Sequence, residues 1–260
     1  MTQFNSPQPI PEIDITIFVS CYNEESFIAQ TLENVTSALQ EAGCTYEIIV
    51  VDDKSIDNSA ERVRQYIHSH PQQPIQLKVS EKNRGLANNY VETAFLGRGK
   101  YYRLCCGDNC EPKDSLVRIF RCTGKADMVI TYQDPNTDDG RTTGRRLLSR
   151  TFTGLVNMIS GYRIRYYNGL ATHLRYNVMR WHPSSYGFGF QADIITRLLD
   201  EGTSYIQIPR LTVERKGTTS TALTMRNILS VIHTLLEITI RRVRRFLYGK
   251  DMSQPQEITP

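Results

Sequence analysis

The sequence predicts an α/β fold with a mostly parallel central sheet and helices on both of its faces. Short, apolar, β-branched segments alternate with amphipathic segments four times before residue 133, and this alternation is typical of parallel sheets. The apolar segments are short and almost free of polar residues, as expected for strands that are buried on both faces. The 260 residues suffice for one large domain with a well-buried core.

The first half contains the clearest strand and helix signals. Its predicted strands are 14–20, 46–53, 75–80, 100–106 and 127–132, and its predicted helices are 24–42, 57–70 and 83–97. Apolar residues recur at helical spacing in the first of these helices. Asp57 is a favourable N-cap for the second helix, and Pro71 ends it.

The second half is less regular. We expect a turn-rich loop over 134–146, since this segment is rich in Gly, Asp, Asn and Thr. The predicted elements that follow are a helix over 145–160, a strand over 169–175, a helix over 189–202, an extended segment over 204–215 and a final helix over 221–248. The predicted organisation is a flexible arm (1–12), a domain (13–220) with halves 13–132 and 133–220, the final helix and a flexible tail (249–260).

Composition and charge exclude several classes of protein. A net charge of +4 is too small to imply nucleic-acid binding by itself. The polar, proline-rich N-terminus lacks the apolar core of a signal peptide, and no uninterrupted apolar stretch approaches the length of a membrane span. The six cysteines form no C-x-x-C pair, so we expect reduced thiols, no zinc and a cytoplasmic location.

Polar clusters follow the predicted strands, where parallel sheets bind ligands. Tyr22, Asn23 and Glu24 follow the first strand, and Asp52 and Asp53 end the second. Buried carboxylates are costly unless they bind something, and these can accept hydrogen bonds from a nucleobase or a ribose. Both clusters are also good helix starts, which is the alternative interpretation.

Two more clusters follow the third and fourth predicted strands. Arg84 and its glycine turn lead into a helix and suit phosphates or ribose, although an ordinary turn is equally consistent. Asp108, Asn109 and Glu111 offer oxygen ligands of the kind that Mg²⁺ or Mn²⁺ prefers, and such an ion would bridge a diphosphate. The alternative is a type I turn with solvated carboxylates.

Arginines and one aspartate stand out in the second half. Arg146 and Arg150 share one helix face and suit a phosphate group; a solvated basic face is the alternative. The nearby arginines that add to this patch are Arg145, Arg163 and Arg165. Asp193 is a candidate general base or acceptor ligand, or else a solvated helix residue.

The final predicted helix is amphipathic. Its end, "IRRVRRFLYGK", alternates apolar and basic residues, a pattern that favours contact with an anionic membrane surface. Packing against the core, with a basic tail, is the alternative for the first half of this helix.

The clusters, in this order, resemble a family 2 glycosyltransferase of the GT-A (Rossmann-like) fold. The resemblance is carried by "VSCYNEE", "IIVVDDKSIDNS", "EKNRGLANN" and "CCGDNCEP" within 13–132. Downstream, "RRLLSRTFTGLVNMISGYRIRYYNGLATHLRYNVM", "GFQADIITRLLDEGTSYIQIP" and "VERKGTTST" look like the dolichol-phosphate mannosyltransferase branch. The family implies inverting transfer from a nucleotide-diphosphate sugar, with a divalent metal on the diphosphate.

The resemblance also implies roles for residues. Glu24, Asp52 and Asp53 would lie in the nucleotide pocket, and Arg146 and Arg150 would face the donor or acceptor phosphates. The residues that match the branch's Arg-x-x-Gly-x-Ser pattern, stretched here to "ERKGTTS", are Arg215 and Ser220.

The chain departs from the family pattern at the metal motif. Aligned from Gly107, the usual Asp-x-Asp becomes Gly107, Asp108 and Asn109, with Glu111 at the following Gln position. Asp108 and Glu111 can restore the charge that Gly107 lacks. The alternatives are a weak affinity for the metal, or no metal at all, with arginines in its place. The acidic residue that precedes the branch's Ser-Gly pair is replaced by Tyr166.

The function expected from the sequence is transfer of a hexose from a GDP- or UDP-sugar to a polyprenyl or dolichyl phosphate, with Mg²⁺ or Mn²⁺. The final helix would bring the protein to the cytoplasmic face of a membrane. One alternative is a saccharide or other hydroxyl acceptor with Asp193 as base. Another is a nucleotide-sugar-binding protein without catalysis.

Overall fold

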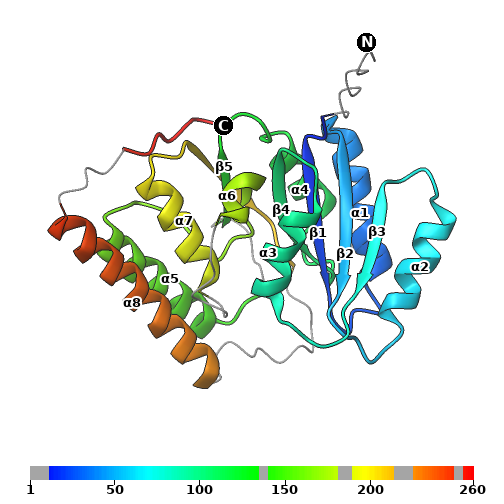
Figure 1. Ribbon diagram of the computed structural model, residues 1–260, viewed down its shortest axis with the longest axis horizontal. Coiled ribbons are helices and arrows are strands. Elements are labelled where there is room, and N and C mark those ends of the chain that lie inside the picture. The colour runs from blue at the N-terminus through cyan, green and yellow to red at the C-terminus, as the bar shows by residue number, and fades with distance from the viewer. Residues whose placement is uncertain (1–11, 135–139, 181–188, 214–224, 249–253) are drawn as a thin grey trace, which may run out of the picture.

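The computed structural model describes residues 12–134, 140–180, 189–213, 225–248 and 254–260 (Figure 1). Its strands are β1 (Ile15–Cys21), β2 (Tyr46–Asp52), β3 (Ile75–Val79), β4 (Tyr101–Cys106), β5 (Met128–Gln133), β6 (Thr172–Leu174) and β7 (Tyr205–Arg210). Its helices are α1 (Ile28–Ala42), α2 (Ser59–Ser69), α3 (Leu86–Leu96), α4 (Lys113–Phe120), α5 (Thr143–Ser160), α6 (Arg175–Met179), α7 (Phe190–Asp200) and α8 (Met225–Leu247).

The strands form one sheet in the order β3-β2-β1-β4-β6-β5-β7. β1 pairs in parallel with β2 and β4, and β5 pairs in parallel with β7. Only β6, among the described strands, is antiparallel, to both β4 and β5. The carboxyl ends of the other strands therefore meet at one edge, which confirms the predicted mostly parallel sheet.

Apolar side chains alternate between the two faces of the sheet, as the two-residue period of a strand requires. On β1, Val19 packs into a core with Leu32 of α1 and Leu116 of α4. Its neighbour Phe18 packs on the other face with Tyr90 of α3 and Ile195 of α7. Helices thus cover both faces, and α5, α7 and α8 gather at the end of the molecule away from β3 (Figure 1).

The structure differs from the sequence prediction in the short elements. α4 and α6 were not predicted, because α4 begins directly after the polar turn and α6 has only five residues. The C-terminal tail was expected to be flexible, but its described residues 254–260 are hydrogen-bonded to β7. Ile258 N–H donates to Tyr205 O (2.8 Å), and Tyr205 N–H donates to Gln256 O (2.9 Å). The tail thereby covers the open edge of β7, which would otherwise be free to pair with another chain. Of the predicted arm, residues 1–11 lie outside the described residues.

A buried ion-pair cluster joins the two halves of the sheet. The Glu111 carboxylate accepts from Arg103 of β4 at 2.7 and 3.1 Å and from Arg210 of β7 at 3.1 Å. Arg103 is fully buried and Glu111 is 5% exposed. Burial raises the pKa of the Glu111 carboxyl, but the guanidiniums of Arg103 and Arg210 outweigh this effect and hold that pKa below its usual range. Glu111 is therefore a buried ion-pair residue, unlike the metal ligand expected from the sequence.

Replacing Glu111 tests this cluster. Glu111→Gln leaves two buried guanidiniums without their counter-charge, so we expect a loss of about 3–5 kcal/mol in the free energy of unfolding. The matched control is Glu41→Gln, because Glu41 pairs with Lys113 on the surface and such pairs contribute about 0–1 kcal/mol. Denaturant unfolding measures both variants; equal losses would contradict the assignment.

A buried histidine predicts how stability depends on pH. His173 of β6 is fully buried, and this burial lowers its pKa from 6.5 to about 4. The unfolded chain therefore binds the proton more readily, so the contribution of His173 is complete above pH 6.5 and is lost as the pH falls toward 4. Between pH 7.5 and 5 we expect this residue to account for a loss of about 2 kcal/mol.

The measurement is denaturant unfolding of the wild type and of His173→Gln at both pH values. The variant cannot take up this proton. Its free energy of unfolding should therefore fall, between pH 7.5 and 5, by about 2 kcal/mol less than that of the wild type. An identical pH dependence of the two proteins would contradict the pKa assigned to His173.

Candidate functional site

Three backbone positions at the carboxyl edge of the sheet are in the left-handed region. Asn23, Lys54 and Asn109 have φ values of 57°, 68° and 54°, and they are the only residues other than glycine with positive φ among those described. They follow β1, β2 and β4. Such a conformation is costly for a lysine and is concentrated at functional sites. The backbone strain therefore marks the same edge that the polar clusters mark.

The two aspartates at the end of β2 have different surroundings. Asp53 accepts from the backbone N–H groups of Arg84 and Gly85, both at 2.8 Å, and so positions the start of α3. Asp52 is buried, and its Oδ1 accepts from Ser55 N–H at 2.8 Å. Its Oδ2 is buried without a hydrogen-bond partner. A buried carboxylate oxygen that lacks a donor is costly in isolation, so Asp52 is suited to receive one from a ligand.

The loop after β1 is held against the loop after β2. Asn23 N–H donates to Ser55 Oγ at 3.0 Å, and Ile56 N–H donates to Asn23 Oδ1 at 2.9 Å. Glu24 N–H donates to Ser59 Oγ at 2.8 Å. Tyr22 is half exposed beside them. The structure thus brings together Tyr22, Asn23, Glu24 and Asp52, as the sequence predicted.

The turn after β4 approaches β1 closely. A Cβ on Gly107 would lie 2.6 Å from Ser20 O and 3.5 Å from Glu24 Cγ, so no side chain fits at this position. Gly107 is therefore required by the packing of β4 on β1. The Glu24 side chain lies next to this turn, which connects the clusters after β1 and β4.

Asp108 is the carboxylate that this turn offers to a cation. Its Oδ1 accepts from Cys110 N–H at 3.2 Å, whereas Asn109 Oδ1 accepts from Asn34 of α1 at 2.7 Å. Glu111 is held by its two arginines. Among the described residues, no three His, Cys, Asp or Glu side chains are grouped as a metal site. The residues fit a Mg²⁺-type ion only in the arrangement in which one carboxylate, substrate phosphates and water share the coordination.

Arg84 directly precedes Gly85, the N-cap of α3. Its guanidinium pairs with Glu92 of α3, and Glu92 also pairs with Lys78 of β3. The backbone N–H of Arg84 is held by Asp53. The structure therefore places Arg84 at the same edge as Asp52, with its side chain turned to a partner on the helix.

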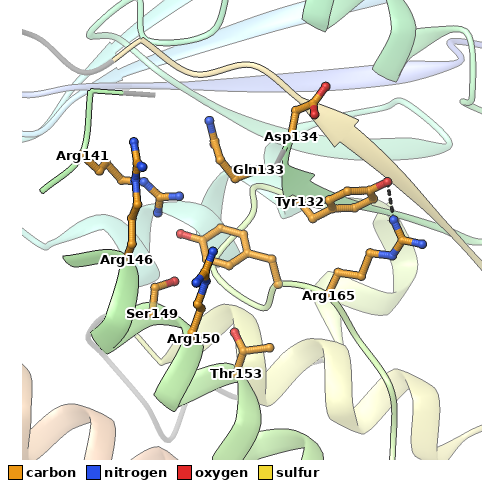
Figure 2. Close-up of a pocket in the computed structure, with 10 residues that line it drawn as sticks. Tyr132, Gln133, Asp134, Arg141, Arg146, Ser149, Arg150, Thr153 and Arg165 are labelled. Atoms are coloured by element: carbon orange, nitrogen blue, oxygen red, sulfur yellow. Dashed lines mark hydrogen bonds between the residues drawn. The ribbon is translucent and has the colours of Figure 1, made fainter. Parts of the chain in front are cut away.

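A basic cavity of about 290 Å³ lies at the end of β5, beside the start of α5. The arginines that line it are Arg141, Arg146, Arg150 and Arg165. Figure 2 shows Arg146 and Arg150 extending from α5 and Arg165 approaching from the opposite side, where it donates to Tyr132 Oη at 2.6 Å. Asp134 is the one carboxylate among the described residues that line the cavity. Guanidinium groups in this arrangement suit a phosphate.

The sequence predicted part of this cavity. Arg146, Arg150 and Arg165 line it, while Arg145 and Arg163 are absent from its lining. The lining residues that were not predicted include Tyr132, Asp134 and Arg141. Arg141 lies in a segment predicted to be a turn-rich loop, and the end of β5 gave no signal beyond its position in the series of strands.

Asp193 has a structural position instead of the predicted catalytic one. It is fully buried in α7, and its carboxylate accepts from Arg197 at 3.0 Å and from Arg241 of α8 at 2.7 Å. Burial raises the pKa of this carboxyl, but the two arginines outweigh burial and lower that pKa overall. A carboxylate with a lowered pKa and two cationic partners is a weak base.

The remaining predicted residues are at the C-terminal side. Arg215 and Ser220 lie outside the described residues. α8 begins at Met225 and ends at Leu247, close to the predicted helix. Its apolar residues Leu229, Ile232, Leu236, Ile240 and Val243 are each 48–60% exposed. In the described part of the chain, no helix combines the length and apolar character that crossing a bilayer requires.

Curated relatives of this chain include transferases named for lipid phosphates. A dolichyl-phosphate beta-glucosyltransferase of Dictyostelium discoideum is 33% identical over 116 residues, which cover 43% of this chain and 36% of the relative. An undecaprenyl-phosphate 4-deoxy-4-formamido-L-arabinose transferase of Edwardsiella ictaluri is 23% identical over 167 residues, which cover 64% and 50%. The matches span between a third and half of the length of these relatives.

Solved structures share the fold. A mannosyltransferase of Pyrobaculum calidifontis, in complex with GDP-Man and Mn²⁺, has a TM-score of 0.58 at 16% identity and covers 95% of this chain and 79% of its own. Glucosyl-3-phosphoglycerate synthase of Mycobacterium tuberculosis, in complex with UDP, has a TM-score of 0.64 at 14% identity, covering 87% and 80%. These likenesses confirm the GT-A fold.

A family model described as "Glycosyl transferase family 2" matches residues 16–181. This match covers more than half of the chain and includes β1 to β6, the clusters at the carboxyl edge and the arginines of α5. The chain belongs to glycosyl transferase family 2.

Proposed function

We propose that the protein transfers a hexose from a nucleotide-diphosphate sugar to a polyprenyl phosphate, with inversion at the anomeric carbon. The observation that carries the proposal is the cavity lined by four arginines at the carboxyl edge of the sheet. Such a cavity suits an acceptor whose reacting group is itself a phosphate. Relatives named for dolichyl and undecaprenyl phosphate support the same class of acceptor.

The donor nucleotide is proposed to bind at the loops after β1 and β2. The unpartnered Oδ2 of Asp52 would accept from an N–H of the base. Asn23 belongs to the same cluster, because it donates to Ser55, which in turn donates to Oδ1 of Asp52. Guanine and uracil both carry such an N–H, so the proposal covers GDP- and UDP-sugars. Asp53 acts indirectly, because it positions Arg84 and the start of α3.

Asp108 is the residue proposed to hold Mg²⁺ or Mn²⁺ on the donor diphosphate. The metal would supply positive charge that stabilises the leaving diphosphate. Asn109 is engaged by Asn34, so it is at most a second ligand. A single carboxylate provides few protein ligands for the metal. We therefore expect the arginines of the cavity to help stabilise the negative charge of the leaving diphosphate.

The reaction needs no strong base. A polyprenyl phosphate is anionic at neutral pH, so its oxygen attacks the anomeric carbon directly as the bond to the nucleotide diphosphate breaks. Arg146, Arg150 and Arg165 would hold and orient the attacking phosphate. For a hydroxyl acceptor, Asp193 is unsuitable because Arg197 and Arg241 hold its carboxylate. Asp134 lines the cavity and would be the candidate base in that case.

Contact with a membrane surface belongs to the same proposal. The exposed apolar residues of α8 form a stripe along the outer side of the helix, and α5 adds exposed Leu147 and Met158. Apolar stripes of this kind lie in the headgroup region of bilayers. A helix in that position would bring the arginine cavity close to a lipid-borne phosphate.

Arg150→Gln tests the acceptor site. Loss of a charged hydrogen bond to phosphate should lower kcat/KM for a short-chain polyprenyl phosphate by about 10- to 100-fold. Arg145→Gln is the matched control, because Arg145 belongs to the same helix but does not line the cavity. Steady-state kinetics with varied acceptor measure both. Equal effects of the two variants would contradict the assignment of the cavity.

Asp108→Asn tests the metal turn. Wild-type protein should bind a nucleoside diphosphate more tightly with Mn²⁺ than without it, and the variant should lose this enhancement while its metal-free affinity stays unchanged. Isothermal titration calorimetry measures the four affinities. Asp114→Asn is the control, because Asp114 is an exposed residue of α4, and this variant should retain the enhancement. Enhancement that persists in Asp108→Asn would exclude Asp108 as the ligand.

A further inference from the structure

The C-terminal part of α8 carries a second group of arginines that the proposed reaction does not use. Arg241, Arg244 and Arg245 are spaced i, i+3 and i+4, so they project from adjacent positions on the helix surface. A cavity of about 660 Å³ is lined by these three arginines and by Tyr248. This group lies next to the exposed apolar stripe, since Ile240, Val243 and Leu247 alternate with it along the helix.

A second cavity adjoins the first. It measures about 440 Å³ and shares Arg241 and Arg245 with its neighbour. Arg180 of the α6 end and Arg197 of α7 also line it, and Glu201 is the one carboxylate among its described lining residues. Arginines are therefore the most frequent charged residues in this lining. Arg180 pairs with Glu201, and Arg197 pairs with Asp193.

Buried carboxylates hold part of this group in place. Asp200 is almost fully buried and accepts from Arg241 Nε at 3.1 Å, while Asp193 accepts from Arg241 at 2.7 Å. Arg245 donates to the backbone oxygen of Asp200 at 2.7 Å. Because a guanidinium carries five N–H donors, these contacts fix its position and leave donors for a further anion.

Arg244 differs from the others. It is exposed, and its side chain has no carboxylate or hydrogen-bonding partner in the described part of the chain. It lies on the same side as Tyr248, which is 75% exposed. Tyrosine and arginine at the border of an apolar stripe are the residue types that favour the interface between headgroups and acyl chains.

The second group is separate from the arginine cavity of the candidate active site. Arg242 donates to Ser160 O, so this end of α8 lies beside the last residue of α5. Arg146, which lines the active-site cavity, is near the start of α5. The helical rise of 1.5 Å per residue places these two ends of α5 roughly 20 Å apart.

We propose that Arg241, Arg244 and Arg245, with Tyr248, form a second phosphate-binding site that holds the head-group phosphate of an anionic phospholipid. The apolar stripe of α8 would enter the acyl boundary beside it. A free phosphate has the same charge, but the position of the site along the border of an exposed apolar stripe favours the lipid. The proposal rests on the membrane contact proposed above and assigns that contact a defined lipid site.

The experiment is co-sedimentation with phosphatidylcholine vesicles that contain or lack phosphatidylglycerol. Arg244→Gln/Arg245→Gln should weaken partition onto phosphatidylglycerol vesicles by about five-fold for each arginine removed. Arg118→Gln is the control, because Arg118 is an exposed arginine on α4 at another surface, and it should change partition little. The proposal would be overturned if the double variant bound the vesicles as well as the wild type does. It would also be overturned if Arg118→Gln lost as much binding as the double variant.

Two additional measurements distinguish a defined lipid site from diffuse attraction and from a site for free phosphate. Arg244→Lys/Arg245→Lys keeps the charge but loses the planar donors, so binding should be restored only in part; full restoration would indicate diffuse attraction and overturn the site. Inorganic phosphate should bind in calorimetry no better to wild type than to the double glutamine variant. If the wild type bound inorganic phosphate and the double glutamine variant did not, the site would be assigned to free phosphate instead of lipid.

The proposed glycosyl transfer is tested separately. With a short-chain, water-soluble polyprenyl phosphate and no vesicles, the double glutamine variant should retain wild-type kcat/KM, since these arginines do not line the active-site cavity. Vesicle binding without transfer would leave the lipid site intact and contradict the reaction. Transfer without a loss of vesicle binding in the double variant would leave the reaction intact and contradict the lipid site.

Discussion

The ion-pair cluster of Glu111 with Arg103 and Arg210 is the interaction on which the site depends. β4 and β7 are separated in the sheet by β6 and β5, yet one carboxylate contacts a guanidinium from each. Three charged groups in a buried position are costly unless each is paired, so the cluster tolerates little displacement. It fixes the turn after β4 relative to the last strand. The proposed metal residue Asp108, three positions before Glu111, is thereby held in a fixed position relative to β7.

The carboxyl edge shows a division between residues that build the site and residues that face a ligand. Asp53 is occupied by the two backbone N–H groups that begin α3, whereas the buried Oδ2 of its neighbour Asp52 has no donor. Gly107 supplies close packing and Asp108 the carboxylate. The left-handed positions Asn23, Lys54 and Asn109 turn the chain sharply after each strand, which keeps these groups close to the sheet.

The first half of the fold could be predicted because each strand ends in an abrupt change from β-branched apolar residues to charged ones, as at Val51 and Asp52. The same local signal pointed to Asp52 and Asp108, and the i, i+4 spacing on a predicted helix pointed to Arg146 and Arg150. Local patterns could not show that Glu111 pairs with Arg210, which is 99 residues away in sequence. They also could not show that Asp193 pairs with Arg241, which is 48 residues away. Asp134 and Arg141 line the cavity because of the path that the chain takes after β5. No local sequence pattern predicts this path.

The two arginine groups have different surroundings that suit different tasks. Those of the cavity beside the start of α5 lie at the edge where strands end, and one carboxylate is found among the described residues that line this cavity. Those of α8 are anchored by the buried Asp193 and Asp200 and border an apolar stripe. The proposed acceptor combines a phosphate for the first cavity with an apolar chain that resides in a membrane, and the proposed phospholipid site of α8 would bring the protein to that membrane. A lipid phosphate therefore accounts for more of the structure than a small soluble acceptor does.

The most direct test of lipid-phosphate glycosylation is product analysis by mass spectrometry. The protein would be supplied with GDP- and UDP-hexoses and Mn²⁺, and with a short-chain polyprenyl phosphate, the matching polyprenol or 3-phosphoglycerate as acceptor. We expect one hexose on the polyprenyl phosphate, joined through the phosphate, and no product from the other two. Transfer to the hydroxyl of phosphoglycerate or of the polyprenol, with none to the polyprenyl phosphate, would contradict the proposed function.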